Sequence, residues 1–262
     1  QIVWGIKDFE KRFARKPEGM WLAETAVDTK TLELLAENDI KFTILSPYQA
    51  KNIRPLGTSK WENVEGGKVN PQRAYLCYLP SGQQISLFFY DGHLAKDVAF
   101  NNLLHSGKAF ADRLMDGFSG EDDGQLVHIA TDGESYGHHH RHGDMALADC
   151  LEHLENDENV ELVNYAAYLE KEPPVFEVEI VENSSWSCAH GIGRWKEDCG
   201  CHTGGEPGWN QQWRQPLRKS LDWLRDQIIP IFEVETDGLL DDCWAARNDF
   251  IEVITNRIPG SE

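Results

Sequence analysis

The stretch LVHIATDGESYG, residues 126–137, joins an apolar run to an acidic loop. Its first five residues predict a β-strand, and Asp132 and Glu134 follow soon after it. The runs IKFTIL at residues 40–45 and ISLFFY at residues 85–90 have the same short, apolar character. Strands of this kind that alternate with helices predict an α/β fold with parallel strands, in which functional residues follow the carboxyl ends of the strands.

The remainder of the chain extends this pattern and then changes. A fourth strand is predicted at residues 176–181, and residues 51–83 are rich in Gly, Pro, Asn and Lys, which indicates a long loop with a hairpin toward its end. Beyond residue 208 only helices are expected, so we predict two regions, 1–208 and 209–262. The predicted helices cover residues 28–39, 97–116, 144–156, 216–232 and 241–257.

The composition excludes several classes of partner. The 262 residues carry a formal net charge of −19, which disfavours nucleic acid and anionic membrane surfaces but is compatible with neutral polymers such as glucans. Nine Trp, seven Tyr and eleven Phe suit stacking on sugars, although most aromatic residues pack in cores. Six cysteines are spread unevenly along a large acidic chain, which predicts a reducing compartment, the cytoplasm.

Two acidic motifs supply the candidate catalytic residues. Glu24 closes GMWLAE, residues 19–24, three residues after Trp21. Asp132 and Glu134 are two residues apart, so on an extended segment both side chains point the same way. Two carboxyl groups so close together are expected to raise the pKa of one of them. A general acid requires such a raised pKa at neutral pH. The alternatives are an ordinary carboxylate at the start of a helix for Glu24 and a polar turn for the Asp-Gly pair.

Histidines follow the second motif closely. His138, His139, His140 and His142 are candidates for metal ligation with Asp132 or Glu134, or for hydrogen bonds to sugar hydroxyls. The alternative for at least two of them is a solvated run that caps a helix. Asp91 closes the strand at residues 85–90 and is a further candidate for substrate binding.

A segment rich in Cys, His, Gly and Trp follows residues 176–181. Its spacing, C-x-H and then C-x-C-H, differs from that of common zinc ribbons but still indicates a candidate zinc site, and the alternative is a set of buried thiols beside a substrate-lining loop. Its tryptophans suit a sugar groove or a packed loop core. The candidate ligands are Cys188, His190, Cys199, Cys201 and His202, and the tryptophans are Trp186, Trp195, Trp209 and Trp213.

Three motifs together resemble glycoside hydrolase family 57. GMWLAE resembles the third conserved region of that family, DGESYG the fourth, and SSWS at residues 184–187 the fifth, and they occur in the family's order. The run over residues 187–218 is similar to a subgroup that carries a helical domain of unknown function after the catalytic barrel. The resemblance therefore covers most of the chain.

The resemblance implies a fold, a reaction and residue roles. The family has an incomplete (β/α)7 barrel and acts on α-glucans with retention, as amylases, 4-α-glucanotransferases and branching enzymes, and it requires no cofactor. Residues 1–208 would then be the C-terminal part of the barrel, and 209–262 the start of the helical domain. Glu24 would be the nucleophile and Asp132 the acid/base. Substrate-binding roles would fall to Trp21, Glu134, His138, Asp91, Trp186 and Trp195.

The sequence also departs from the family pattern. Ala23 replaces the commoner proline, and the first two conserved regions of the family are missing and would lie before Gln1. We therefore expect a fragment whose partners are an α-glucan or maltooligosaccharide and the missing N-terminal part of the same barrel. The competing hypotheses are a metal-dependent carbohydrate hydrolase or deacetylase on a related barrel, and a glycan-binding module without catalysis.

Overall fold

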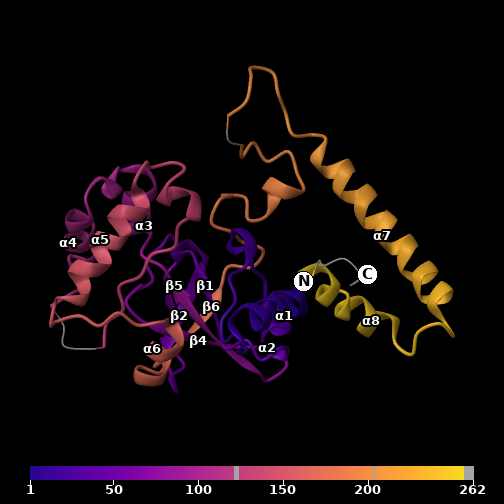
Figure 1. The fold of residues 1–262 in the computed structure, drawn as a ribbon, viewed down its shortest axis with the longest axis horizontal. Coiled ribbons are helices and arrows are strands. Elements are labelled where there is room, and N and C mark those ends of the chain that lie inside the picture. Colours follow the sequence, from indigo (N-terminus) through magenta and orange to yellow (C-terminus); the bar gives the residue numbers. More distant parts are fainter. Residues whose placement is uncertain (121–123, 203, 257–262) are drawn as a thin grey trace. The chain divides into compact units, whose positions relative to one another are not determined.

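The computed structural model shows two compact units (Figure 1). We call the larger one, formed by Gly19–Ala36 and Ile40–Trp186, the sheet unit. The other, which we call the helical unit, contains Gln1–Glu18, Glu37–Asp39 and the chain from Ser187 onward. The structure describes residues 1–120, 124–202 and 204–256.

The sheet unit is built on six strands in the order β1-β5-β4-β6-β2-β3. Strand pairs β1/β5 and β4/β6 are parallel, whereas β4/β5, β2/β6 and β2/β3 are antiparallel. The predicted α/β fold with parallel strands is thus confirmed, within a mixed sheet. The strands are β1 Phe42–Leu45, β2 Ala50–Pro55, β3 Glu62–Asn63, β4 Ala74–Tyr78, β5 Gln84–Phe89 and β6 Phe176–Ile180.

The predicted hairpin is formed by β4 and β5. Leu79 N–H donates to the Gln83 carbonyl, and Gly82 adopts a φ of 87°, which closes the turn. Strand β5 lies between β1 and β4, and its apolar side chains Leu87, Phe88 and Phe89 are fully buried. The prediction of a loop for the first part of residues 51–83 is wrong, because β2 and β3 lie there and β2 pairs with the distant β6.

Helices α3, α4 and α5 of the sheet unit lie close together on one side of the sheet (Figure 1). A single helix over residues 97–116 is a wrong prediction. Asn102 has a left-handed φ of 57°, and the Ser106 hydroxyl accepts a hydrogen bond from Ala109 N–H, so that a new helix begins at Gly107. The helices are α2 Thr29–Glu37, α3 Gly92–Phe100, α4 Gly107–Met115, α5 Gly143–Glu155 and α6 Tyr165–Lys171.

The apolar run at residues 126–130 pairs with no strand of the sheet among the described residues. Leu126 N–H donates to the Gln72 carbonyl at 2.9 Å, and the His128 carbonyl accepts from Asp91 N–H at 3.0 Å. The prediction of a strand here is wrong because these separate bonds replace continuous pairing. The run still leads the chain directly to Asp132.

The helical unit brings the start of the chain onto its C-terminal helices. Helix α1 contacts α9, and Lys7 Nζ pairs with Asp249 Oδ1 at 2.5 Å, 242 residues away along the chain. Arg247 lies over the Trp4 ring at 5.4 Å. The predicted helix at residues 241–257 is split in two, and its last residue, Arg257, lies outside the described residues. The helices are α1 Ile2–Phe13, α7 Arg214–Thr236, α8 Cys243–Asp249 and α9 Ile251–Thr255.

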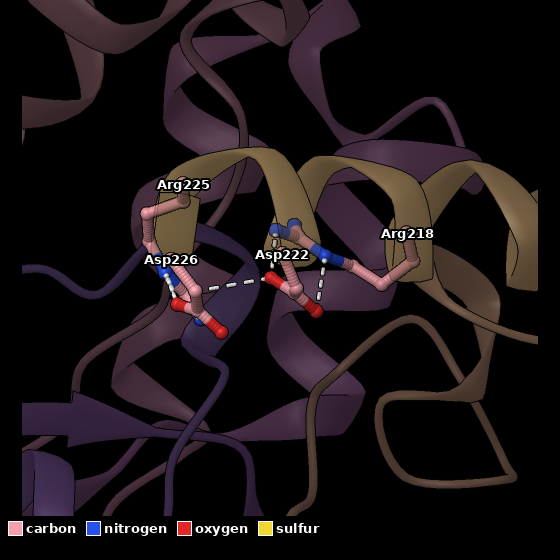
Figure 2. A network of polar contacts seen from close by, with 4 residues as sticks. All are labelled: Arg218, Asp222, Arg225 and Asp226. Atoms are coloured by element: carbon pink, nitrogen blue, oxygen red, sulfur yellow. Dashed lines mark hydrogen bonds and ion pairs between the residues drawn. The ribbon is translucent and has the colours of Figure 1, made fainter. Parts of the chain in front are cut away.

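Helix α7 confirms and extends the helix predicted at residues 216–232. Figure 2 shows a surface network in which Arg225 pairs with Asp222 at 3.1 Å and with Asp226 at 2.8 Å, while Arg218 pairs with Asp222. Exposed pairs of this kind contribute little to stability, because water and salt screen the charges. No helix in the described ranges has the length and apolar character that crossing a bilayer requires.

Candidate active site

Glu24 lies in a strained turn. It belongs to the 3-10 helix Ala23–Thr25, and the backbone φ angles of Glu24 and Thr25 are 59° and 51°. Left-handed φ values cost residues with a Cβ about 1–2 kcal/mol each, so the surrounding contacts must hold them. Such strain is typical of functional sites, where it fixes the direction of a reactive side chain.

Trp186 provides many of these contacts. Its indole Nε1–H donates to Glu24 Oε2 at 3.1 Å, and its backbone N–H lies 3.0 Å from the Thr25 hydroxyl oxygen and 3.2 Å from the Glu24 carbonyl. Val27 and Ser184 exchange two further backbone hydrogen bonds, at 3.0 and 3.2 Å. The fold therefore places the third and fifth motifs side by side, 162 residues apart in the chain.

Gln49 is a positioning residue that the sequence analysis missed. Its side chain is 1% exposed, and Nε2 donates to the Thr25 carbonyl at 2.8 Å and to Ser184 Oγ at 3.1 Å. Its Oε1 accepts from Ser46 N–H at 2.9 Å, as part of a capping box. The pattern Ser46-Pro47-x-Gln49 carries that signal in the sequence. Nothing in the sequence indicates the bonds to Thr25 and Ser184.

A cavity of about 510 Å³ lies beside Asp132 in the sheet unit. Asp132 is exposed and precedes the 3-10 helix Gly133–Tyr136. Trp21 lines the same cavity, and its ring centroid lies 5.2 Å from that of Trp186, whose N–H binds Glu24. Aromatic walls with a few polar groups are typical of a sugar site. The lining residues are Trp21, Ile44, Ile129, Ala130, Thr131, Asp132, Gly133, Tyr136 and Tyr165.

A neutral histidine supports one wall of this cavity. His128 is buried, and its Nδ1 lies 3.1 Å from the Tyr165 hydroxyl while Nε2 lies 3.2 Å from the Pro71 carbonyl. Because a carbonyl can only accept, Nε2–H donates and Nδ1 accepts from Tyr165. Burial lowers the pKa of His128 to about 4 and raises the pKa of Tyr165 to about 12, so both side chains are neutral at neutral pH.

The remaining candidates in the sheet unit have local partners. Asp91 Oδ1 accepts from the backbone N–H groups of His93 and Leu94 at 2.9 and 3.0 Å, so its carboxylate caps α3. Glu134 is exposed, and its carbonyl accepts from His138 and His139 N–H. The His138 ring lies 4.9 Å from that of His139. Within residues 124–202, these histidines and acids form no group of three ligands close enough for one metal ion.

The predicted Cys/His ligands form a separate cluster in the helical unit. Cys188 Sγ lies 3.8 Å from Cys201 Sγ and 4.0 Å from Cys199 Sγ, and His190 Nδ1 lies 3.4 Å from Cys201 Sγ. These four ligand atoms lie within 4.8 Å of one another. His202 is not in this group, because its exposed ring contacts the Gly204 carbonyl instead. Trp195 also belongs to the helical unit.

Two known protein families match parts of the chain. The profile of glycosyl hydrolase family 57 matches residues 1–180, more than half of the chain. The chain belongs to glycosyl hydrolase family 57. A domain of unknown function, DUF3536, matches residues 209–261 and overlaps the C-terminal helices of the helical unit.

Solved structures with the same fold include several enzymes. The chain matches an exo-type maltose-forming amylase from Pyrococcus sp. ST04 with a TM-score of 0.69 and 16% identity, over 97% of this chain and 46% of that one. A 4-alpha-glucanotransferase from Thermococcus litoralis matches with a TM-score of 0.54 and 21% identity, over 70% and 27%. A GH57-type branching enzyme from Pyrococcus horikoshii gives 0.55 and 21%, over 73% and 44%.

These matches define how much of a family 57 enzyme the chain represents. The chain spans between about a quarter and a half of the length of the three enzymes. No curated protein is similar enough to count as a match. The likeness to the three enzymes shows that they share the fold of this chain.

Proposed function

We propose that this family 57 chain carries the catalytic pair of a retaining enzyme that acts on α-glucans, either as a hydrolase or as a transglycosylase. Glu24 is the nucleophile and Asp132 is the general acid/base. One chain of contacts supports the proposal: Asp132 shares a cavity with Trp21, the Trp21 ring packs on Trp186, and the Trp186 indole binds the Glu24 carboxylate.

In the proposed reaction, ionised Glu24 attacks the anomeric carbon while protonated Asp132 donates its proton to the leaving glycosidic oxygen. The bond to the leaving sugar breaks, and a glycosyl ester forms on Glu24. Asp132 then removes a proton from water or from a sugar hydroxyl, whose oxygen displaces Glu24. Water gives hydrolysis, and a sugar hydroxyl gives transglycosylation. Retention predicts about 5–5.5 Å between the two carboxyl groups in the working enzyme.

Side chains around the pair have supporting roles in this proposal. The Trp186 indole N–H fixes the direction of the Glu24 carboxylate through its hydrogen bond at 3.1 Å. Trp21 and Trp186 present rings on which a pyranose face stacks. Glu134 tunes Asp132, and His138 binds sugar hydroxyls. Asp91 and Trp195 are further candidates for substrate binding, and Asp91 also caps α3.

The comparisons favour α-glucans as the substrate class. The similar structures are named as a maltose-forming amylase, a 4-alpha-glucanotransferase and a branching enzyme. The competing metal-dependent hydrolase requires ligands that converge beside Asp132, and within the described part of the chain the convergent group lies at Cys188 instead. We propose that the reaction itself needs no cofactor and uses the two carboxyls alone.

Product analysis of the full-length protein on amylose and maltooligosaccharides tests the proposal. Glu24→Gln and Asp132→Asn should each lower turnover by at least about a hundredfold, since a covalent nucleophile and a general acid contribute on this scale. Glu158→Gln is the matched control, because Glu158 is exposed on the same unit and lies outside the cavity lining.

Two outcomes would contradict the proposal. Retained activity of Glu24→Gln would refute its role as nucleophile. Binding of α-glucans by the unaltered protein without any product would instead support a glycan-binding module. Nuclear magnetic resonance of the first-formed anomer adds a direct check, because double displacement requires the product to keep the α configuration.

A further inference from the structure

The segment between β6 and α7 gathers sulfur and nitrogen ligands at one point. Cys188 and His190 come from one turn, and Cys199 and Cys201 come from a second turn about ten residues later. We propose that these four side chains bind a single Zn²⁺ ion, which holds the loop at residues 188–201 in its folded form. This inference does not depend on the proposed carbohydrate chemistry.

The distances fit one tetrahedral ion. With Zn–S bonds of about 2.3 Å and Zn–N bonds of about 2.0 Å, two ligand atoms on a tetrahedron lie about 3.5–3.8 Å apart. The corresponding separations are 3.8 Å for Cys188–Cys201, 4.0 Å for Cys188–Cys199 and 3.4 Å for Cys201–His190. These three separations are close to the tetrahedral values, and all four ligand atoms lie within 4.8 Å of one another, so the ligands must draw together by at most about 1 Å to bind the ion.

The same distances argue against other uses of the thiols. A disulfide requires sulfur atoms about 2.05 Å apart, and all six cysteines are free in this structure. Three thiols that meet at one point cannot all pair with one another. Three thiolates and one imidazole favour zinc among the common ions, and four protein ligands leave no open position for a substrate. The chemistry therefore points to a structural ion.

The backbone brings these ligands together. Gly191 follows His190 with a φ of 71°, and Gly200 separates Cys199 from Cys201 with a φ of 83°. Glycine adopts these left-handed angles without steric cost, so both tight turns can direct their ligands to the same point. Gly193 lies against the cluster, since a Cβ at this position would lie 3.3 Å from the Cys199 Cβ.

The cluster also connects to the start of α7. Arg214 Nη1 donates to the Cys201 carbonyl at 3.3 Å, and Asp198 Oδ1 accepts from Gln211 N–H at 2.9 Å. Between Ile180 and Arg214 the described residues contain only the short 3-10 helix Gly193–Trp195. Ordering a loop of this length costs conformational entropy, and the binding of an ion by four ligands offsets that cost.

Metal analysis of the full-length protein tests the inference. Protein purified from zinc-supplemented medium should contain about one zinc ion per chain, by the four-ligand stoichiometry of a structural site. Cobalt(II) should exchange into the site and give the visible absorption of a tetrahedral ion together with thiolate charge-transfer bands. Removal of the metal should expose the loop at residues 188–201 to proteolysis.

Matched variants separate the site from incidental binding. Cys199→Ser and His190→Asn should lose zinc and the cobalt spectrum, whereas His190→Cys should retain both, because a fourth thiolate replaces the imidazole. Cys243→Ser and His202→Asn are the controls, since these two side chains lie outside the cluster. If Cys199→Ser fails to fold, the two His190 variants provide the same comparison.

The inference would be overturned if the protein bound neither zinc nor cobalt, or if the control variants lost metal as fully as the ligand variants. A cobalt spectrum without thiolate charge-transfer bands would also overturn it. These measurements are independent of glycan turnover. A negative result in the activity assays would therefore leave the zinc site untouched, and a negative metal analysis would leave the catalytic proposal untouched.

Discussion

Replacing Gln49 by leucine should loosen the segment that carries Glu24. Leucine is somewhat larger than glutamine, and its side chain makes no hydrogen bond. The substitution removes the bonds at 2.8 Å to the Thr25 carbonyl, at 3.1 Å to Ser184 Oγ and at 2.9 Å from Ser46 N–H. At about 1 kcal/mol for each buried bond, the free energy of unfolding should fall by about 3 kcal/mol.

Urea unfolding followed by circular dichroism measures this loss, and thermal unfolding should show a decrease of about 6–12 °C for a domain of this size. The change should reach the site as well, because Thr25 is held at a left-handed φ next to Glu24. We therefore expect the proposed turnover on maltooligosaccharides to show a lower kcat with a nearly unchanged KM, since positioning affects the reacting carboxylate rather than the sugar platform.

Gln83→Leu is the matched control, because Gln83 is exposed in the turn between β4 and β5. Its free energy of unfolding should change by less than about 0.5 kcal/mol, as surface substitutions usually do. A loss below about 1 kcal/mol in Gln49→Leu would refute the reasoning, because three satisfied buried bonds cannot be removed at so small a cost. An equal loss in both variants would refute it too.

Two further predictions concern stability. The pKa of buried His128 is lowered to about 4, below its unfolded value of about 6.5, so the unfolded chain binds the proton first as the pH falls. As the pH falls from about 7 to about 4, this histidine should therefore lower the free energy of unfolding by about 3 kcal/mol. Urea unfolding of His128→Gln should not show this loss at low pH. If the free energies of unfolding of the two proteins changed in parallel with pH, the prediction would be contradicted. Gly19→Ala should destabilise the protein by about 1–3 kcal/mol, because the new Cβ would overlap the Phe42 ring, and Gly120→Ala is the control, with open space around it. An unchanged melting temperature in Gly19→Ala would show that Phe42 moves aside freely.

Local patterns in the sequence are enough to predict several elements. The strands near residues 40–45, 85–90 and 176–181 are short apolar runs bounded by turn residues, and each appears in the sheet. The hairpin before residue 90 and the helix that contains residues 216–232 follow from patterns of the same local kind. The three family motifs are also local, so they indicate the family without knowledge of the fold.

The predictions of secondary structure are wrong where the structure depends on a strand partner distant in the sequence or on a residue that caps a new helix. The run at residues 126–130 has the composition of a strand. Its backbone, however, makes separate hydrogen bonds to Gln72 and Asp91 instead of pairing along a neighbouring strand. No local pattern predicts strand β2, because its partner, β6, lies more than 120 residues later. The break between α3 and α4 depends on the Ser106 cap, which competes with helical periodicity.

By itself the sequence determined the alternation of strands and helices, the order of the motifs and the inventory of acids, thiols and aromatic rings, because each of these depends on near neighbours and on residue type. Only the tertiary structure decided which of them meet. It joined Trp186 to Glu24, placed Trp21 beside Asp132, added Gln49 beneath the turn and left His202 outside the sulfur cluster. Such contacts depend on the pairing of segments far apart in the sequence and on the packing of whole side chains, and neither produces a periodic pattern in the sequence.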